Sequence, residues 1–468
     1  MKKVLTLIMS LIFVFALSAC VGGGGRGETE VNVLDELPNE PINITIWTGF
    51  GQANADLMQV MFDSFTEQYP QVTITQLSQG GWGGVRDAMI QAIVAGTTPT
   101  IVMGYPDHFV EYLNGNAIIP LNDYISHPDH GVDLEDFVQG FLDENRQEIF
   151  EGMIYAMPFA KSTEMVVYNR TVLEHHGINI DPNTPLTWQD IENIAETTDI
   201  LGTGDMQCEF LINADSAANL FITASRQWGA PYTNAAGEIL VDNETTREML
   251  AYFQDLMDRN ILAFPIEWDQ AYGSQPFQRG DVCMSQGSTA GTRHNIPRLE
   301  DGKFGIFEMG VLPAMQFEDA VNSSMQQGPN IAIVSDATDA ERLAAWLLIR
   351  YMTNTENTAW FAMNTGYVPV RISGFETPEY QEFLSIIDLY NEVGFDGLTF
   401  DQRDRLPFVQ AAQAAFNQVD YFSFDPAFVG RTSSSGARNE AELLFEAIYA
   451  GTRTIDEAIR RMLSQLGQ

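Results

Sequence analysis

Patterns of strand and helix alternate between residues 42 and 104, and this alternation constrains the fold more than any other feature of the sequence. Residues 42–47 alternate apolar and polar side chains as a half-buried strand does, and residues 56–69 gather apolar side chains on one helical face. Two further strands and an apolar helix between them are predicted at 72–75, 100–103 and 85–94. This order predicts an α/β fold with a mostly parallel sheet, in which ligands bind beyond the carboxyl ends of the strands.

A polar crossing at residues 161–163 indicates that the chain does not stay in one lobe. Lys161, Ser162 and Thr163 are too polar for a core position, yet they directly precede an apolar run at 165–168 that is typical of a buried strand. We therefore predict that the chain crosses here from a first lobe to a second, with Ser162 and Thr163 facing the gap between them. Further crossings are predicted near residues 330 and 373, so each lobe would be discontinuous in sequence.

The residues around this crossing resemble those of a known family. Short motifs follow one another in a fixed order: Pro158-Phe159, Ser162-Thr163, Tyr168-Asn169, Gly177 and Thr187-Trp188. The series is similar to the hinge-crossing segment of extracellular solute-binding proteins of the carbohydrate ABC-transporter class, family 1. Later segments extend the resemblance over nearly the whole chain: Phe277, Gly280, Met284, Gly287 and Ser288, then Phe304-Gly305-Ile306 and Gly310-Val311-Leu312-Pro313, and then Gly366-Tyr367, Pro369 and Arg371.

The resemblance implies a periplasmic-binding-protein-like fold, in which two discontinuous α/β lobes are joined by a three-segment hinge with a ligand cleft between them. Lobe 1 would hold residues 41–160 and 330–372, and lobe 2 residues 161–329 and 373–468. The resemblance also implies a monomeric receptor rather than an enzyme. Such a receptor binds a carbohydrate without a cofactor or metal and delivers it to the transmembrane subunits of an ABC permease.

The chain of 468 residues carries a formal net charge of −39, which excludes several kinds of partner. Its 45% hydrophobic content is typical of a folded protein, and its length suits two lobes better than one core. A field of this sign repels polyanions, so DNA, RNA and anionic bilayers are not expected to bind the body of the protein. A solvated acidic surface suits a salty or extracellular medium.

The N-terminus has the pattern of an export signal. Lys2-Lys3 precedes an apolar run at residues 4–17, and Leu17-Ser18-Ala19-Cys20 follows as a small-residue cleavage site. A cysteine here resembles the lipobox of bacterial lipoproteins, in which Cys20 is lipidated; the alternative is a plain secretory signal. We expect a signal peptide over 1–20 and a flexible tether over 21–40. The acyl chains alone would anchor the protein to the outer or periplasmic face of the bacterial cytoplasmic membrane.

Two cysteines remain after Cys20. Cys208 and Cys283 each stand in a short strand-like run, where both a disulfide and a pair of buried free thiols are compatible with the sequence. The six histidines are scattered, and no Cys/His cluster has the spacing of a zinc site, so no metal is expected.

A sugar site needs two kinds of side chain. Planar polar groups satisfy the hydroxyls at the edge of the sugar ring, and aromatic rings pack on its apolar faces. The aromatic candidates follow predicted strands or flank loops: Trp47, Trp82, Tyr105, Trp228 and Tyr367. The polar candidates are Asp107, Ser162, Asp215, Ser288, Asn330 and Arg371, and each of them could instead cap a helix or satisfy a turn. The loops of Tyr105 and Tyr367 also resemble ligand loops of the family.

The sequence leaves the ligand and two other functions open. Arg371 and Arg431 could hold an acidic or phosphorylated ligand, such as a glycerol-phosphate compound, or each could pair with a carboxylate. A surface-anchored glycoside hydrolase would need two carboxylates across a cleft, and no motif marks such a pair. A ferric-ion receptor of the same fold would need clustered tyrosines, but Tyr155 and Tyr168 are not adjacent. The acidic balance favours neutral sugars.

Overall fold

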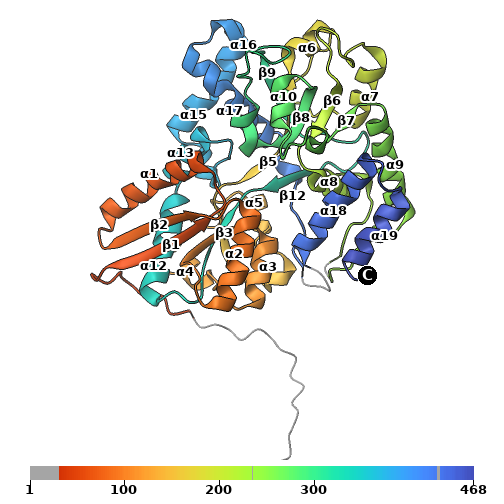
Figure 1. The fold of residues 1–468 in the computed structure, drawn as a ribbon. Coiled ribbons are helices and arrows are strands. Elements are labelled where there is room, and N and C mark those ends of the chain that lie inside the picture. The colour runs from red at the N-terminus through yellow and green to blue at the C-terminus, as the bar shows by residue number, and fades with distance from the viewer. Residues whose placement is uncertain (1–30, 235, 429–432) are drawn as a thin grey trace, which may run out of the picture.

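The computed structural model describes residues 31–234, 236–428 and 433–468, which form two lobes (Figure 1). The predicted signal peptide with Cys20 lies outside the described residues, and so does Arg431. Residues 31–40 of the predicted tether are described and lie against lobe 1. Val31 is buried there, and Val33, Leu34 and Leu37 pack on the same core. No helix of the described chain is both long and apolar enough to cross a membrane.

Lobe 1 is built on a five-stranded sheet. Its strands are β1 (Ile42–Thr48), β2 (Val72–Ser78), β3 (Ile101–Gly104), β4 (Ala156–Pro158) and β11 (Asn330–Ile333). Their order is β2-β1-β3-β11-β4. β1 pairs in parallel with β2 and β3, as the alternation predicts, but β11 lies antiparallel to both β3 and β4. The sheet is therefore mixed, because β11 returns from lobe 2 rather than through a helix on the face of this sheet.

Helices cover both faces of this sheet. They are α1 (Gln52–Gln68), α2 (Trp82–Ala95), α3 (Pro106–Asn114), α4 (Asn122–Ile125), α5 (Gln139–Asp143), η1 (Glu148–Phe150), α12 (Asp339–Met352) and α13 (Thr355–Asn364). α1 begins four residues before its predicted start and buries Met58, Met61, Phe62 and Phe65, which recur at helical spacing. α12 adds the fully buried Trp346, so the apolar faces of both helices close the core of lobe 1.

Lobe 2 is organised around one buried strand. Its strands are β5 (Ser162–Asn169), β6 (Phe210–Ala214), β7 (Leu262–Ala263), β8 (Val282–Ser288), β9 (Met309–Pro313), β10 (Ser324–Gln327) and β12 (Phe422–Ser423). Every residue of β5 is buried. β5 pairs antiparallel with β8 along one edge, and with β10 and then β9 along the other. Among the paired strands of this sheet, β6 is parallel to β7 and to β8, and β10 is parallel to β12. The other pairs are antiparallel, so this sheet also differs from the mostly parallel sheet that the sequence predicts.

The remaining helices cover lobe 2 or join it to lobe 1. They are α6 (Arg170–His175), α7 (Trp188–Thr197), α8 (Ala217–Trp228), α9 (Glu244–Asp258), η2 (Pro265–Trp268), α10 (Ser274–Arg279), η3 (Thr289–Gly291), α11 (Thr292–Asn295), α14 (Ile372–Phe375), α15 (Pro378–Leu384), α16 (Ile386–Gly397), α17 (Phe400–Phe416), η4 (Val419–Tyr421), α18 (Ser434–Tyr449) and α19 (Ile455–Gln465). Capping boxes open α7 at Thr187 and α19 at Thr454. Cys208 and Cys283 form a disulfide within lobe 2.

Two short connections join the sheets side by side. The chain passes from β4 to β5 through residues 159–161 and returns from β10 to β11 through Gly328-Pro329. Gly328 has a φ of 104°, and a Cβ there would lie 2.0 Å from the carbonyl oxygen of Ala160, so the two connections touch. A third connection runs from α13 in lobe 1 through α14, α15 and α16 to α17, which packs on β9 and β5.

One expectation about the first crossing is wrong, namely that its polar residues face an open gap between the lobes. Lys161, Ser162 and Thr163 are all buried, with exposed fractions of 0%, 3% and 1%, so they are not too polar for the interior and do not face an open gap. Their polar groups are all bonded. Lys161 Nζ donates to the carbonyl oxygen of Gly328 at 2.7 Å, Thr163 Oγ1 donates to that of Met325 at 3.1 Å, and Ser162 Oγ accepts from a neighbouring serine.

Candidate functional site

A cavity of about 250 Å³ lies between the two lobes next to the hinge, and we call it the polar cleft. Lobe 1 lines it with Trp82, Gly83, Arg86, Tyr105, Pro106, Asp107, His108 and Glu144. The other wall is formed by Gln326, Gln327, Asp425, Ser435, Arg438 and Asn439. Because the two walls belong to different lobes, any ligand held here contacts both of them.

Two aromatic side chains form part of the lobe 1 wall. Tyr105 follows the carboxyl end of β3 and precedes the first residue of α3, whereas Trp82 is the first residue of α2. Their ring centroids lie 5.7 Å apart, and Trp82 packs edge-on against Phe50 at 5.0 Å. Phe50 supports Trp82 from behind, so the aromatic wall has a defined position before a ligand arrives.

An ion pair dominates the lobe 2 wall. Arg438 on α18 donates from Nη1 to Asp425 Oδ2 at 2.8 Å and from Nη2 to the side-chain oxygen of Asn219 on α8. Burial lowers the pKa of Arg438, but Asp425, together with Asp107 and Tyr232, outweighs burial and raises it. Burial raises the pKa of Asp425, and Arg438 opposes that rise. The pair is therefore a fixed, charge-compensated hydrogen-bonding surface.

Of the other charges at the cleft, that of Arg86 is compensated and that of Asp107 is not. Arg86 pairs with Asp87 at 2.8 Å. His108 lies beside Asp107, with 4.0 Å between Nε2 and Oδ1, but burial lowers the pKa of His108 and keeps its ring neutral at pH 7. Among the described residues, Asp107 forms no ion pair with a lysine or an arginine. The cleft as a whole therefore carries no excess of positive charge.

Glu144 connects the floor of the cleft to the hinge. Its Oε1 accepts from Lys161 Nζ and, at 2.6 Å, from Asn330 Nδ2. Its Oε2 accepts from Gln326 Nε2 at 2.5 Å. Glu144, Lys161, Gln326 and Asn330 are all buried, and the carboxylate compensates the charge of Lys161. Burial nonetheless lowers the pKa of Lys161, against the pull of Glu144.

The comparison with known proteins decides the family. A family model described as bacterial extracellular solute-binding protein matches residues 60–383, which is more than half of the chain. The chain belongs to this family. The sn-glycerol-3-phosphate-binding periplasmic protein UgpB of Pectobacterium atrosepticum is similar to this solute-binding protein, with 23% identity over 336 residues. That match covers 69% of this chain and 71% of the relative.

Solved structures share the fold. UgpB from Mycobacterium tuberculosis in complex with glycerophosphocholine has a TM-score of 0.72 and 18% identity, covering 92% of this chain and 98% of that one. Maltose-bound T. maritima MalE3 has a TM-score of 0.68 and 17% identity, covering 91% and 99%. The family and the two-lobe fold expected from the sequence are thereby confirmed.

Three of the sequence-derived candidates meet at the polar cleft, namely Trp82, Tyr105 and Asp107. The other aromatic candidates do not line it. Trp47 lies within β1, paired with Leu77 and Val102 across the sheet. Trp228 packs on Tyr252 and Phe317 in the core of lobe 2. Tyr367 is 8% exposed and stacks on Phe361, next to Phe50, so it supports the aromatic wall from behind.

Four polar candidates lie beside the hinge or in lobe 2 without lining the cleft. Ser288 Oγ donates to Ser162 Oγ at 3.1 Å, and this pair joins β8 to the first connection. Asn330 reaches the cleft only through its bond to Glu144. Asp215 accepts from the backbone N–H of Gly273 at 2.5 Å, and burial raises its pKa to about 6.

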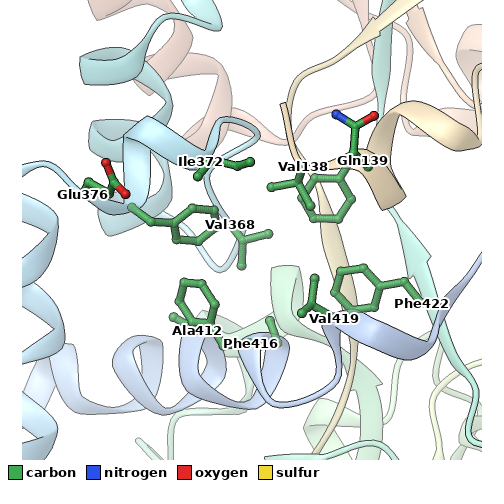
Figure 2. Close-up of a pocket in the computed structure, with 12 residues that line it drawn as sticks. Val138, Gln139, Val368, Ile372, Glu376, Ala412, Phe416, Val419 and Phe422 are labelled. Carbon is green, nitrogen blue, oxygen red and sulfur yellow. The ribbon is translucent and has the colours of Figure 1, made fainter. Parts of the chain in front are cut away.

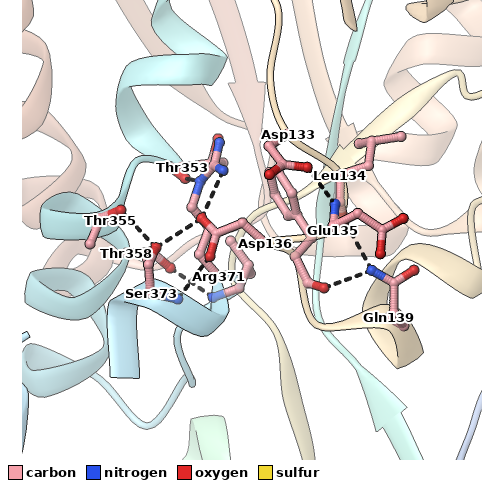
Figure 3. A network of polar contacts seen from close by, with 12 residues as sticks. Asp133, Leu134, Glu135, Asp136, Gln139, Thr353, Thr355, Thr358, Arg371 and Ser373 are labelled. Atoms are coloured by element: carbon pink, nitrogen blue, oxygen red, sulfur yellow. Dashed lines mark hydrogen bonds and ion pairs between the residues drawn. The ribbon is translucent and has the colours of Figure 1, made fainter. Parts of the chain in front are cut away.

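Arg371 is held inside lobe 1 and takes no part in the polar cleft. Its Nη1 donates to Asp136 Oδ2 at 3.1 Å, its Nε donates to the carbonyl oxygen of Thr353, and its guanidinium lies over the ring of Phe137 at 4.2 Å (Figure 3). Asp136 also accepts from the backbone and hydroxyl of Ser373. Of the two alternatives that the sequence leaves open for Arg371, the structure has the pairing with a carboxylate.

A second cavity, of about 360 Å³, is lined in part by α5 and is almost entirely apolar; we call it the apolar cavity (Figure 2). It is lined by Val138, Gln139, Phe141, Val368, Ile372, Phe375, Glu376, Ala412, Ala415, Phe416, Val419 and Phe422. Phe141 of lobe 1 stacks on Phe422 of lobe 2 at 5.6 Å. This cavity also has walls from both lobes, but it offers few groups that could bond a polar solute.

Sequence reasoning missed the residues that give the polar cleft its charge pattern, namely Arg438, Asp425 and Glu144. One signal was available for Arg438. The chain has only 24 Lys and Arg against 63 Asp and Glu, so every arginine is a scarce cation. Asp425 and Glu144 carry no such signal, because acidic residues are abundant throughout the chain.

Proposed function

We propose that this protein is the substrate receptor of an ABC importer and binds a neutral carbohydrate in the polar cleft. The observation that carries the proposal is that two different walls line one cleft. Trp82 and Tyr105 form an aromatic wall, and Arg438 and Asp425 form a charge-compensated polar wall. Sugars need both surfaces, because their faces are apolar and their edges carry hydroxyls.

The size and charge of the cleft favour a small neutral ligand. At about 250 Å³ it is smaller than the roughly 300–1,000 Å³ typical of sites for drug-sized ligands. This volume suits a monosaccharide or a short oligosaccharide that projects towards solvent. Each cation at the cleft has a carboxylate partner, so a neutral hydroxyl-rich solute can bind without displacing an ion pair.

Closure of the lobes would signal occupancy to the permease. Contacts already bridge the lobes at the rim: Ser435 Oγ donates to Glu111 Oε1 at 2.6 Å, and the N–H of Ala427 donates to Gln147 Oε1 at 2.8 Å. A ligand bound to both walls adds to these contacts and stabilises the closed state. The sugar leaves unchanged, because the receptor delivers it and does no chemistry on it.

The same proposal covers location and chain organisation. Export by the predicted signal peptide, lipidation of Cys20 and anchoring at the outer face of the membrane would place the receptor beside its permease. The proposed lobe boundaries remain 41–160 with 330–372 and 161–329 with 373–468. The receptor is proposed to act as a monomer.

A glycerol-phosphate compound is the second candidate ligand. α2 and α3 both begin at the cleft, and neither Gly81 nor Tyr105 caps its helix with a side chain. Free N–H groups at the start of a helix attract anions. The UgpB relatives, named for binding sn-glycerol-3-phosphate or solved with glycerophosphocholine, point the same way.

A thermal-shift series tests both ligands. Glucose, maltose, maltotriose, sn-glycerol 3-phosphate and glycerophosphocholine are each added to the purified protein, and the compound is then recovered and analysed. We expect a sugar to raise the melting temperature and to be recovered intact. A shift with the phosphate compounds alone would replace the carbohydrate by the second candidate, and cleavage of a sugar would overturn the receptor in favour of a hydrolase.

A further inference from the structure

One carboxylate holds two of the three hinge connections. Glu144 accepts hydrogen bonds from Lys161 in the first connection and from Asn330 directly after the second. It also accepts from Gln326, which lies two residues before Gly328 of the second connection. Lys161 closes the group by donating to the carbonyl oxygen of Gly328 at 2.7 Å. All these side chains are buried, so water cannot replace the bonds when one partner moves.

A second carboxylate holds the start of the third connection. Asp136 Oδ1 accepts from the backbone N–H of Ser373 at 2.9 Å, and Oδ2 accepts from the Ser373 hydroxyl and from Arg371 (Figure 3). The backbone repeats the attachment, since the N–H of Ile372 donates to the carbonyl oxygen of Asp136 at 2.6 Å. The third connection also meets the first, because the N–H of Val368 donates to the carbonyl oxygen of Lys161.

Both carboxylates belong to one short stretch of lobe 1, residues 136–144, which we call the hinge-linking segment. It contains α5, and its Phe137, Phe141 and Leu142 are buried in the core of lobe 1. Its Glu144 end lines the polar cleft, whereas Val138 and Phe141 line the apolar cavity. The segment therefore contacts the ligand site and all three connections at once.

We propose that the hinge-linking segment couples the polar cleft to the hinge, with Glu144 and Asp136 as positioning residues that keep the three connections in one arrangement. A solute that contacts Glu144 or Gln326 shifts this segment, and the three connections move together rather than one at a time. The coupling within the hinge is independent of the ligand, whereas its response to a solute rests on the proposed function.

Hydrogen exchange at the hinge, measured without ligand, tests the coupling. Glu144→Gln alone leaves the Lys161 ammonium buried without a counter-charge, so we expect it to fold poorly. The double variant Glu144→Gln with Lys161→Met removes both charges and is expected to recover the melting temperature. Asp136→Asn weakens the other end of the segment. Glu192→Gln, whose partner Arg259 lies 2.9 Å away in lobe 2, is the matched control.

The decisive readout is the propagation of the change from one end of the segment to the other. We expect the double variant to speed exchange roughly tenfold at the N–H of Ser373, which Asp136 holds, as well as at Ala160. Asp136→Asn should in turn speed exchange at Ala160. The control should change neither amide. Exchange that speeds up only beside each substitution would overturn the coupling, and Asp136→Asn decides this even where the double variant does not fold.

A ligand arm separates the two proposals. Maltose and sn-glycerol 3-phosphate are added to the wild-type protein, and protection is followed at Ala160, Val368 and Ser373. Protection of all three amides by either compound supports the response to a solute, whereas protection of one amide alone overturns it. Absence of any effect from both compounds counts against the proposed ligands, and the ligand-free variants still decide the coupling.

Discussion

The two cavities between the lobes lie close together and differ completely in chemistry. The polar cleft is lined by aromatic rings, ion pairs and amides, whereas the apolar cavity has only Gln139 and Glu376 as polar neighbours. Adjacent parts of the chain supply both. Phe141 faces the apolar cavity and Glu144, one helical turn later, lines the polar cleft. Residues three positions apart in one segment therefore line cavities of opposite polarity, so the polarity of each cavity is not a property of a whole lobe.

The largest effect is expected from breaking the ion pair of the polar cleft. Arg438→Met leaves Asp425 without its partner and removes a donor to Asn219. We expect the affinity for the bound solute to fall by about 2–5 kcal/mol, measured by isothermal titration calorimetry. Arg298→Met is the matched control, because Arg298 and Asp404 form an exposed pair of little energetic weight. Equal loss in both variants would show that the effect is not specific to the cleft.

Replacing one aromatic residue in each cavity by alanine compares how much the two cavities contribute to solute binding. Trp82→Ala removes part of the aromatic wall and should weaken solute binding by roughly 1–3 kcal/mol. Phe416→Ala makes a similar truncation in the apolar cavity and should leave the affinity unchanged. The measurement is again calorimetric, with melting temperatures to exclude unfolding. Weaker binding in Phe416→Ala would mean that the apolar cavity also contributes to recognition.

The smallest effect concerns a carboxyl beside the polar cleft. Burial raises the pKa of Glu164 from 4.5 to about 7, although Asn219 and Arg438 oppose the rise. The folded state therefore holds a proton that the unfolded state releases. The stability that this proton provides is complete below about pH 4.5 and is lost as the pH rises through about 7.

Thermal unfolding between pH 5 and pH 8 tests this linkage. The wild type should lose stability as the pH rises over that range. In Glu164→Gln this loss should be smaller by about 1–2 kcal/mol. Burial raises the pKa of Asp215 to about 6. The free energy of unfolding of Glu164→Gln should therefore still fall as the pH rises, but at lower pH. Glu376→Gln, at the apolar cavity, is the matched control and should follow the wild-type curve. A Glu164→Gln curve that parallels the wild type would contradict the assignment.

Local patterns in the sequence were sufficient for the elements of the fold. Helical spacing located α1, and the alternation of apolar and polar residues at 42–47 located β1. The crossing at residues 159–161 could be found because polar residues interrupt an apolar run. Periodicity depends on neighbours within a few residues, which is why a single sequence reveals it.

Long-range partners could not be read from the sequence. Arg438 bonds to Asn219, which lies 219 positions away, and Lys161 is stable in the interior only because Glu144 and Gly328 satisfy it. The three antiparallel partners of β5 likewise come from distant segments. Tyr105, Trp82 and Asp107 reach the polar cleft because they begin helices next to the strand ends, a position that the α/β pattern does predict.

The docking of residues 31–37 has a mechanical consequence. Val31, Val33, Leu34 and Leu37 attach the chain to lobe 1 before β1 begins, so a pull from the N-terminal side acts on lobe 1 and not on the hinge. A protein held at that end would keep lobe 1 stationary beside the surface. Lobe 2, which carries α18 and α19, would then be the lobe that moves when the polar cleft opens.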